Sequence, residues 1–174
     1  MDALIPRGAA VELVADGLMW TEGPCWVKDE ELGRSYLLFS DTVANKLYKW
    51  EEGKGLFTVG KSVYLDRSGC RADAARCARL REPGSNGLAQ SGGSGSLVVC
   101  EHGERRVTRL HPNGTVVPLA THFRGRRLNS PNDVAVPGGG SLCEQIYFTD
   151  PPYGLNGKEE DPERELPFNG VYRI

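Results

Sequence analysis

The sequence predicts an all-β fold of the β-propeller type, and three features of its 174 residues lead to that prediction. Glycine and proline are abundant, at 22 and 11 residues, and both interrupt helices and favour tight turns. Short alternating apolar runs recur along the chain, whereas no window of about 11 or more residues has a clean helical apolar period. These short runs form similar groups, each opened by a polar residue, which is typical of propeller blades.

The first expected blade opens at Glu22 and has four strands. Its third strand, 45–50, alternates polar and apolar residues, as a half-buried strand should. A lead-in at 1–19 precedes the blade and contains one possible strand at 11–14. The four strands are expected at 25–27, 36–41, 45–50 and 56–59.

Two further blades are expected to open at Asn86 and Asn132. Strands of the second are predicted at 86–90, 97–101, 106–110 and 116–119, and strands of the third at 132–136, 146–150 and 170–174. The chain therefore contains about three to three and a half blades. A propeller closes its ring to protect its edges, usually with about four to eight blades, so we expect this chain to be part of a larger ring or to pair with something else.

Residues 61–84 interrupt the repeat. From Asn86 to Asn132 there are 46 residues (132 − 86), near the roughly 40–50 of a propeller blade. From Glu22 to Asn86 there are 64 (86 − 22), so we interpret 61–84 as a solvated loop insertion within a single partial propeller spanning 1–174. Its Ala/Arg-rich patch could form one or two exposed helical turns. Cys70 and Cys77 could pair, but we expect them to be free.

Composition indicates a soluble globular protein: 39% of residues are hydrophobic, 25% are charged and the net charge is −2. That charge argues against nucleic acid or an anionic membrane as partner. No apolar run approaches the roughly 20 residues that span a bilayer, and the acidic, Pro6-interrupted N-terminus is no secretory signal, so we expect a cytoplasmic protein. Five cysteines without a CxxC pair suggest reduced thiols, with Cys25, Cys100 and Cys143 as small core residues.

The polar strand openings are the candidate functional site. The innermost strand of each propeller blade lines the central channel, so Glu22, Asn86 and Asn132 should converge at one mouth. One carboxylate and two amides form an oxygen-rich set suited to Ca²⁺, Mg²⁺ or Mn²⁺. The alternative is that the Asn and Asp side chains only cap tight turns.

Five motifs resemble the gluconolactonase branch of the SMP-30/gluconolactonase/LRE family: TEGP at 21–24, CEHG at 100–103, RRV at 105–107, LNSPND at 128–133 and YFTDPPYG at 147–154. The resemblance covers nearly the whole chain except the insertion and the extreme N-terminus. NSPND followed by FTDPPYG is specific, whereas EGP alone is weak. The resemblance implies a six-bladed propeller with one divalent cation (Ca²⁺, Zn²⁺, Mg²⁺ or Mn²⁺) in its channel, hydrolysing sugar lactones or related cyclic esters.

The resemblance also implies roles for single residues. Glu22 matches the first metal ligand of the family, and Asn132 matches the channel Asn that faces metal or substrate. The family's other ligands, an Asn and an Asp, belong to blades absent here, so this chain alone should hold the ion weakly. The implied chemistry is a cation-activated carbonyl or water with a carboxylate as general base. In the family that base is usually the ligand Asp of the absent blades; Asp133 is the weaker candidate within this chain, since it could instead cap its own turn.

Asn86 and His102 are the further candidates for substrate binding, although His102 could instead be a structural histidine. Arg105 and Arg106 could hold an acidic substrate or bridge blades. The expected partner is a small-molecule lactone. The competing hypothesis is a non-catalytic propeller fragment that serves as a binding or interaction scaffold. Nucleotide binding and serine-type hydrolysis have no support, because the sequence has no P-loop, Rossmann fingerprint or GxSxG motif.

Overall fold

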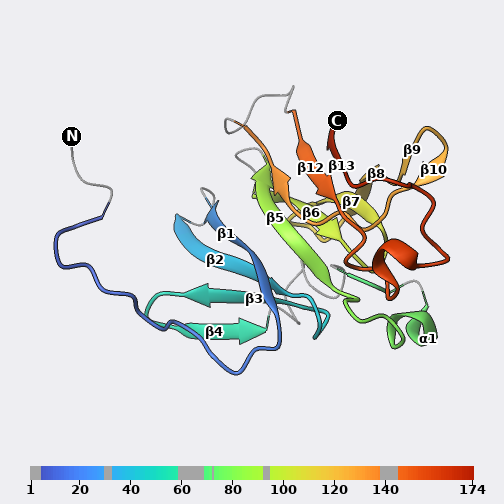
Figure 1. Cartoon of the computed structure of the whole chain (residues 1–174). Coiled ribbons are helices and arrows are strands. Elements are labelled where there is room, and N and C mark those ends of the chain that lie inside the picture. Colours follow the sequence, from blue (N-terminus) through green and yellow to red (C-terminus); the bar gives the residue numbers. More distant parts are fainter. Residues whose placement is uncertain (1–4, 30–32, 59–68, 72, 92–94, 138–144) are drawn as a thin grey trace.

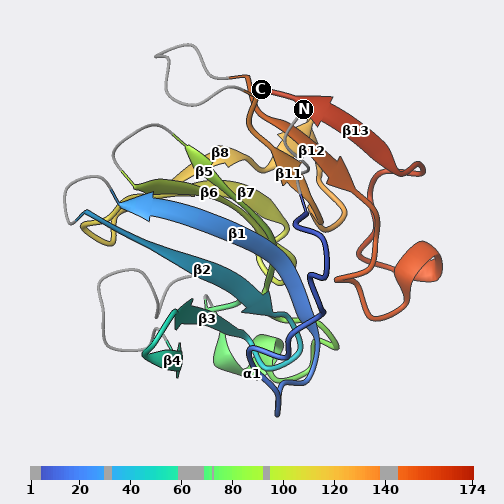
Figure 2. The same cartoon turned by 90° about the vertical axis from the view of Figure 1, so that its left-hand side faces the viewer.

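The structure is a computed structural model that describes residues 5–29, 33–58, 69–71, 73–91, 95–137 and 145–174. It is an all-β fold of antiparallel sheets, which confirms the all-β part of the prediction. Figures 1 and 2 show the three larger sheets arranged one after another along the chain, with strand β5 (Ser85–Ser91) lying next to β1 (Thr21–Asp29) on one side and β11 (Val134–Ala135) on the other. Within the described residues, no helix has the length and apolar character needed to cross a bilayer.

The first two sheets are four-stranded meanders with the same strand order. The first contains β1 (Thr21–Asp29), β2 (Arg34–Asp41), β3 (Lys46–Glu51) and β4 (Gly55–Thr58). The second contains β5 (Ser85–Ser91), β6 (Ser96–Glu101), β7 (Arg106–Leu110) and β8 (Val116–Ala120). Both groups of four strands are therefore present as predicted, with β1 longer than expected.

The first strand of each meander carries an irregularity at the same place. The pairing of β1 with β2 shifts register between Glu22 and Cys25, and the pairing of β5 with β6 shifts between Ser85 and Leu88. Bulges of this kind bend a strand and re-aim its side chains. The polar openings of β1 and β5 are thus structurally equivalent.

The third sheet is smaller than expected. It contains β11 (Val134–Ala135), β12 (Tyr147–Asp150) and β13 (Gly170–Arg173), in that order. The predicted strand at 132–136 shortens to two residues because Asn132 and Asp133 bond to Thr149 outside the ladder. Between β12 and β13 a long loop contains the 3₁₀ turn η1 (Lys158–Glu160).

Two expectations about short elements are wrong or incomplete. The possible strand at 11–14 does not form, and Val11 and Leu13 are exposed because no strand among the described residues pairs with them. An unpredicted hairpin joins β9 (His122–Phe123) to β10 (Arg126–Arg127). Its two-residue turn has positive φ at both positions, which is the turn type that short hairpins favour.

Two hydrophobic clusters hold the three sheets together, and β6 contributes to both. All six β6 residues are buried. Since side chains alternate across a strand, Leu97 and Val99 pack toward the first sheet while Val98 and Cys100 pack toward the third. Cys25 and Cys100 are core residues as predicted, and burial raises the pKa of both thiols. Cys143 lies outside the described residues.

The insertion contains the short helix α1 (Ala74–Cys77), which matches the predicted helical turn. Asp73 caps it by accepting hydrogen bonds from the backbone N–H groups of Ala75 and Arg76. The expectation of free thiols at Cys70 and Cys77 is wrong, because these residues form a disulfide. The helical turn brings their Cα atoms to 5.5 Å, within the range a disulfide spans. For this pair, cysteine usage therefore no longer supports a cytoplasmic location.

Replacing both Cys70 and Cys77 by serine is expected to lower the free energy of unfolding by about 2 kcal/mol, because the disulfide closes a short loop in the unfolded chain. Urea unfolding without reductant would measure the change. Reduced wild-type protein is the control and should match the double variant. Identical unfolding of oxidised and reduced wild type would contradict the prediction.

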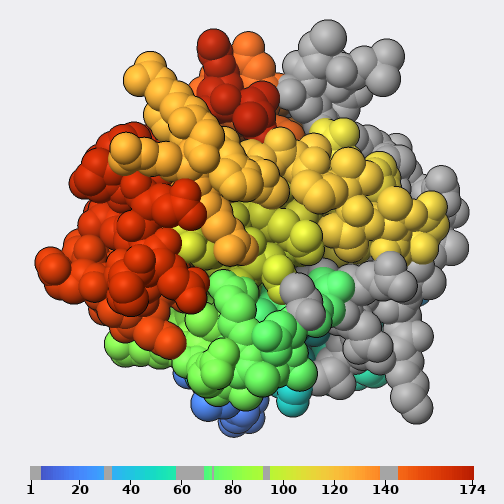
Figure 3. Space-filling view, turned by 90° about the vertical axis from the view of Figure 1, so that its right-hand side faces the viewer, coloured from blue at the N-terminus to red at the C-terminus, as the bar shows by residue number. Residues whose placement is uncertain are grey.

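The described part of the insertion packs against the rest of the molecule rather than extending into solvent as a loop. Arg76 donates from Nη1 to Gly103 O at 2.7 Å, and Gly84 donates its backbone N–H to Thr42 O at 2.8 Å. In Figure 3 the green surface of α1 meets the red surface of the loop before β13. The interpretation of 61–84 as solvated holds for the exposed residues of the insertion, such as Ala74 and Ala75 of α1, but it is wrong for the buried Cys70, Pro83 and Gly84.

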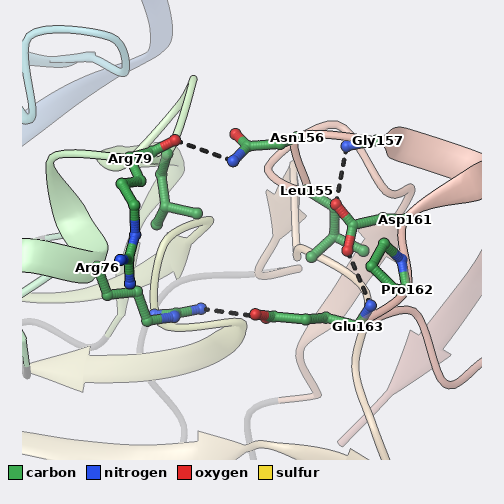
Figure 4. A pocket seen from close by; sticks show the side chains of 9 residues that line it. Arg76, Arg79, Leu155, Asn156, Gly157, Asp161, Pro162 and Glu163 are labelled. Carbon is green, nitrogen blue, oxygen red and sulfur yellow. Dashed lines mark hydrogen bonds and ion pairs between the residues drawn. The ribbon is translucent and has the colours of Figure 1, made fainter.

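A cavity of about 360 Å³ lies where α1 meets that loop (Figure 4). Asn156 spans it, donating from Nδ2 to Arg79 O at 2.9 Å, and Arg76 faces Glu163 at 3.9 Å. None of the residues predicted for the functional site lines this cavity. The Asn156–Arg79 hydrogen bond and the Arg76–Glu163 ion pair tie the insertion to the loop between β12 and β13.

Candidate functional site

The backbone segments at the three polar strand openings contact one another, the first with the second and the second with the third. Gly23 has φ +58°, and a Cβ on it would lie 2.2 Å from the carbonyl oxygen of Asn86. A Cβ on Gly87 would lie 2.7 Å from the carbonyl oxygen of Asn132, to which the Gly87 N–H also donates at 2.7 Å. Only glycine permits these backbone approaches. They bring the segments of Glu22, Asn86 and Asn132 side by side.

Glu22 is held at its opening by the segment that precedes β1. The indole Nε1 of Trp20 donates to Glu22 Oε1 at 3.0 Å. Asp41, which is buried, accepts hydrogen bonds from the backbone N–H groups of Met19 and Trp20 at 2.9 and 3.1 Å, so it anchors that segment. Among the described residues, none donates a hydrogen bond to the second oxygen of Glu22.

Asn86 is buried, and its backbone is tied to the first sheet. Ser40 Oγ lies 2.8 Å from both Asn86 O and Ser85 Oγ. Within the described part of the chain, the side-chain amide of Asn86 makes no hydrogen bond. Its amide oxygen is therefore available at the opening.

Asn132 and Asp133 behave differently although they are adjacent. The Asn132 amide nitrogen Nδ2 lies 3.2 Å from His102 Nε2. Asp133 is exposed and its Oδ1 accepts from the backbone N–H of Val134 at 2.8 Å, which is the turn-capping alternative weighed for it. The second carboxylate oxygen of Asp133 accepts no hydrogen bond from any described residue.

His102 is fully buried, with both ring nitrogens in contact with protein. Its Nδ1 lies 3.1 Å from Glu82 Oε2, and its Nε2 faces Asn132. No ring nitrogen is left for a sugar hydroxyl in this arrangement. Sequence reasoning missed Glu82 because it lies in the insertion, outside every repeat.

The two specific motifs, NSPND and FTDPPYG, are joined by hydrogen bonds. Asn129 donates from Nδ2 to Asp150 O and Phe168 O, both at 3.0 Å, and from its backbone to Asp150 Oδ2 at 2.8 Å. Ser130 Oγ donates to Pro151 O and accepts from Gly154 N. Burial raises the pKa of Asp150 to about 6, despite the hydrogen bonds from Asn129 and Ser130 and the nearby charge of Arg105.

Arg105 bridges the second and third sheets, as one of its two interpretations predicted. Its Nε donates to Leu128 O at 2.8 Å and Asn129 O at 2.9 Å, and its Nη1 donates to Glu163 O at 2.9 Å. The side chain is buried, which lowers the pKa of the guanidinium. Arg106 instead pairs with the buried Glu101, whose pKa is raised by burial.

The donor set at the openings fits a hard divalent cation. The uncommitted oxygen of Glu22 and the amide oxygens of Asn86 and Asn132 are the ligand types that Ca²⁺, Mg²⁺ and Mn²⁺ prefer. Among the described residues, the one group of three His, Cys, Asp or Glu side chains close enough to share an ion is Cys70, Cys77 and Glu104. Those two sulfurs are bonded to each other, so the openings are the better candidate site.

The chain is an all-β protein built from repeated antiparallel sheets that resemble blades. Side chains with oxygen atoms lie where the first strand of each larger sheet begins. The chain belongs to the SMP-30/gluconolactonase/LRE-like family, whose model matches residues 20–174. A curated gluconolactonase from Zymomonas mobilis is 36% identical over 177 residues, which cover 100% of this chain and 45% of the relative.

Two solved structures share the fold. A candidate gluconolactonase solved by X-ray crystallography has a TM-score of 0.69 and 32% identity, over 97% of this chain and 50% of that one. A gluconolactonase from Xanthomonas campestris has a TM-score of 0.64 and 31% identity, over 92% and 46% of the two chains. The chain thus spans about half the length of the relatives it matches.

Proposed function

We propose that this chain is the N-terminal portion of a divalent-cation-dependent lactonase that hydrolyses sugar lactones or related cyclic esters. The observation that carries the proposal is the series of backbone contacts through Gly23 and Gly87. These contacts bring together the backbone segments that carry the carboxylate of Glu22 and the amides of Asn86 and Asn132, which supports the proposal. The identity to a gluconolactonase supports the substrate class.

The proposed architecture of the complete protein is a six-bladed propeller. Three successive sheets occupy a chain that spans about half the length of its relatives, which supports a ring of twice that number. Further ligands for the ion would then come from blades beyond these three.

Each opening residue has a proposed task. Glu22 and the amide oxygen of Asn132 would hold the cation, which supplies carbonyl polarisation and lowers the pKa of water when bound. Asn86 would donate or accept a hydrogen bond with the lactone through its uncommitted amide. Asp133 would take the proton of the attacking water on the carboxylate oxygen that does not cap its own turn.

One observation favours the competing scaffold function. Phe168, Val171 and Ile174, on and beside β13, expose 45%, 74% and 44% of their surface, and a partner could cover these apolar side chains. A neighbouring blade could cover them equally well. The metal dependence of hydrolysis separates the two functions.

Removal of divalent cations is expected to abolish lactone hydrolysis. The assay follows acid release from an aldonolactone, using the protein in a form that continues beyond Ile174, with the 174-residue chain in parallel. Excess chelator should reduce the rate to that of the uncatalysed reaction, and added Ca²⁺, Zn²⁺, Mg²⁺ or Mn²⁺ should restore it. The 174-residue chain alone should show little activity. An unchanged rate in excess chelator would rule out the metal mechanism.

A further inference from the structure

Three side chains, of which the central one is fully buried, form a hydrogen-bonded chain that ends at the proposed site. Glu82 Oε2 lies 3.1 Å from His102 Nδ1, and His102 Nε2 lies 3.2 Å from Asn132 Nδ2. The His102 side chain is 0% exposed and that of Glu82 is 14% exposed. The chain therefore links a carboxylate from the insertion to the opening of the third sheet.

The chemistry of these groups allows one consistent set of donors and acceptors. An amide nitrogen only donates, so the His102 Nε2 that faces Asn132 must accept and carry no proton. The proton of the neutral ring then sits on Nδ1, where it donates to Glu82. In the opposite tautomer, a bare Nδ1 would face the carboxylate, and two acceptors would oppose each other. Glu82 thus selects the tautomer that holds the Asn132 nitrogen and turns its amide oxygen away from the ring.

The surrounding backbone keeps this arrangement rigid. The His102 N–H donates to Gly84 O at 3.1 Å, which places the ring beside the residues that follow Glu82. Gly154 packs over the ring so closely that a Cβ there would lie 2.8 Å from His102 Cβ. The hydrogen bond from Cys70 to Pro83 then ties Glu82's neighbour to the disulfide-bonded segment. These contacts fix the backbone segments that carry Glu82 and His102.

We propose that Glu82 and His102 are positioning residues that orient the Asn132 amide, so that its oxygen faces the ion or lactone at the openings. This inference rests on the proposed function and extends it, since it assigns a task to the insertion. The sequence analysis named His102 as a candidate for direct contact with the substrate. The proposal instead places His102 behind Asn132. Partners of this kind, one shell behind a ligand, typically alter metal affinity by about 10–100-fold.

Two substitutions at His102 separate orientation from packing. His102→Gln keeps a polar atom near the place of Nε2 and can still accept from Asn132. His102→Asn keeps one near the place of Nδ1 and can reach only Glu82. If His102 orients Asn132, Mn²⁺ binding followed by electron paramagnetic resonance on the full-length protein should weaken about tenfold or more in His102→Asn. It should stay within about threefold of wild type in His102→Gln.

His122→Asn is the matched control, because His122 is exposed on β9, and it should bind Mn²⁺ like wild type. Equal affinities in His102→Asn and His102→Gln, when wild type binds Mn²⁺, would overturn the positioning role alone. If wild type binds no Mn²⁺, the proposed function fails and the inference with it, which is a different result.

Nuclear magnetic resonance of ¹⁵N-labelled histidine tests the same inference without a metal-binding assay. The ring of His102 in the wild-type protein should carry its proton on Nδ1, and Glu82→Gln should weaken that preference. A proton on Nε2 alone in wild type would overturn the proposed orientation of Asn132, whether or not the protein hydrolyses lactones.

Discussion

Replacing Arg105 by methionine is expected to lower the free energy of unfolding by about 3–5 kcal/mol. The guanidinium donates to three backbone carbonyls, those of Leu128, Asn129 and Glu163, and it is buried between the second and third sheets. Methionine fills much of the same volume but donates nothing, so buried acceptors lose their partners. The positive φ of Arg105 is equally unfavourable for methionine and does not contribute to the difference.

Urea unfolding of Arg105→Met and Arg105→Lys would measure this effect. Lysine keeps the charge but lacks the planar guanidinium, whose N–H groups reach three carbonyls. Arg105→Lys should therefore retain less than about half of the stability that Arg105→Met loses. Arg126→Met is the matched control: Arg126 is exposed, and its replacement should change stability by about 0.5 kcal/mol or less. A loss below about 1 kcal/mol in Arg105→Met would show that the sheets do not depend on this bridge.

Glu22→Gln is expected to lower lactone turnover at least tenfold, with little effect on folding. Glutamine has the shape of glutamate and can still accept from Trp20 Nε1, so the opening should keep its geometry. The substitution removes the single carboxylate that the proposed ligand set contributes, and a hard cation binds a neutral amide less strongly than a carboxylate.

The measurement is kcat and KM for an aldonolactone in saturating Mn²⁺ and in limiting Mn²⁺, together with the Mn²⁺ affinity. The loss should be larger in limiting Mn²⁺. Glu52→Gln serves as the control, because Glu52 lies exposed in the turn between β3 and β4. Equal turnover in Glu22→Gln and wild type at every Mn²⁺ concentration would remove Glu22 from the site.

The strands of the first two sheets were predictable because their apolar alternation coincides with turns rich in glycine. The third sheet was predicted less well. At Asn132 and Asp133 the backbone bonds to Thr149 take the place of a regular ladder, which shortens β11 to two residues. The possible strand at 11–14 had a suitable composition, yet it lacks a partner strand, and a strand without one has no ladder.

The candidate site was predictable only as far as it repeats. Glu22, Asn86 and Asn132 were found because each opens an equivalent strand. Glu82 and Asp41 carried no such signal, because their importance depends on the groups they meet: His102 for one, and the backbone of Met19 and Trp20 for the other.

Sequence alone determined the all-β class, the grouping of strands and the polar residues that open them, because all of these follow from local periodicity and turn chemistry. Tertiary structure alone decided which distant groups meet. The disulfide between Cys70 and Cys77, the bridge made by Arg105 and the chain from Glu82 to Asn132 each join segments whose separation in sequence says nothing of their separation in space. Burial then decides their energetic weight, because a polar group removed from water must find its partner within the protein.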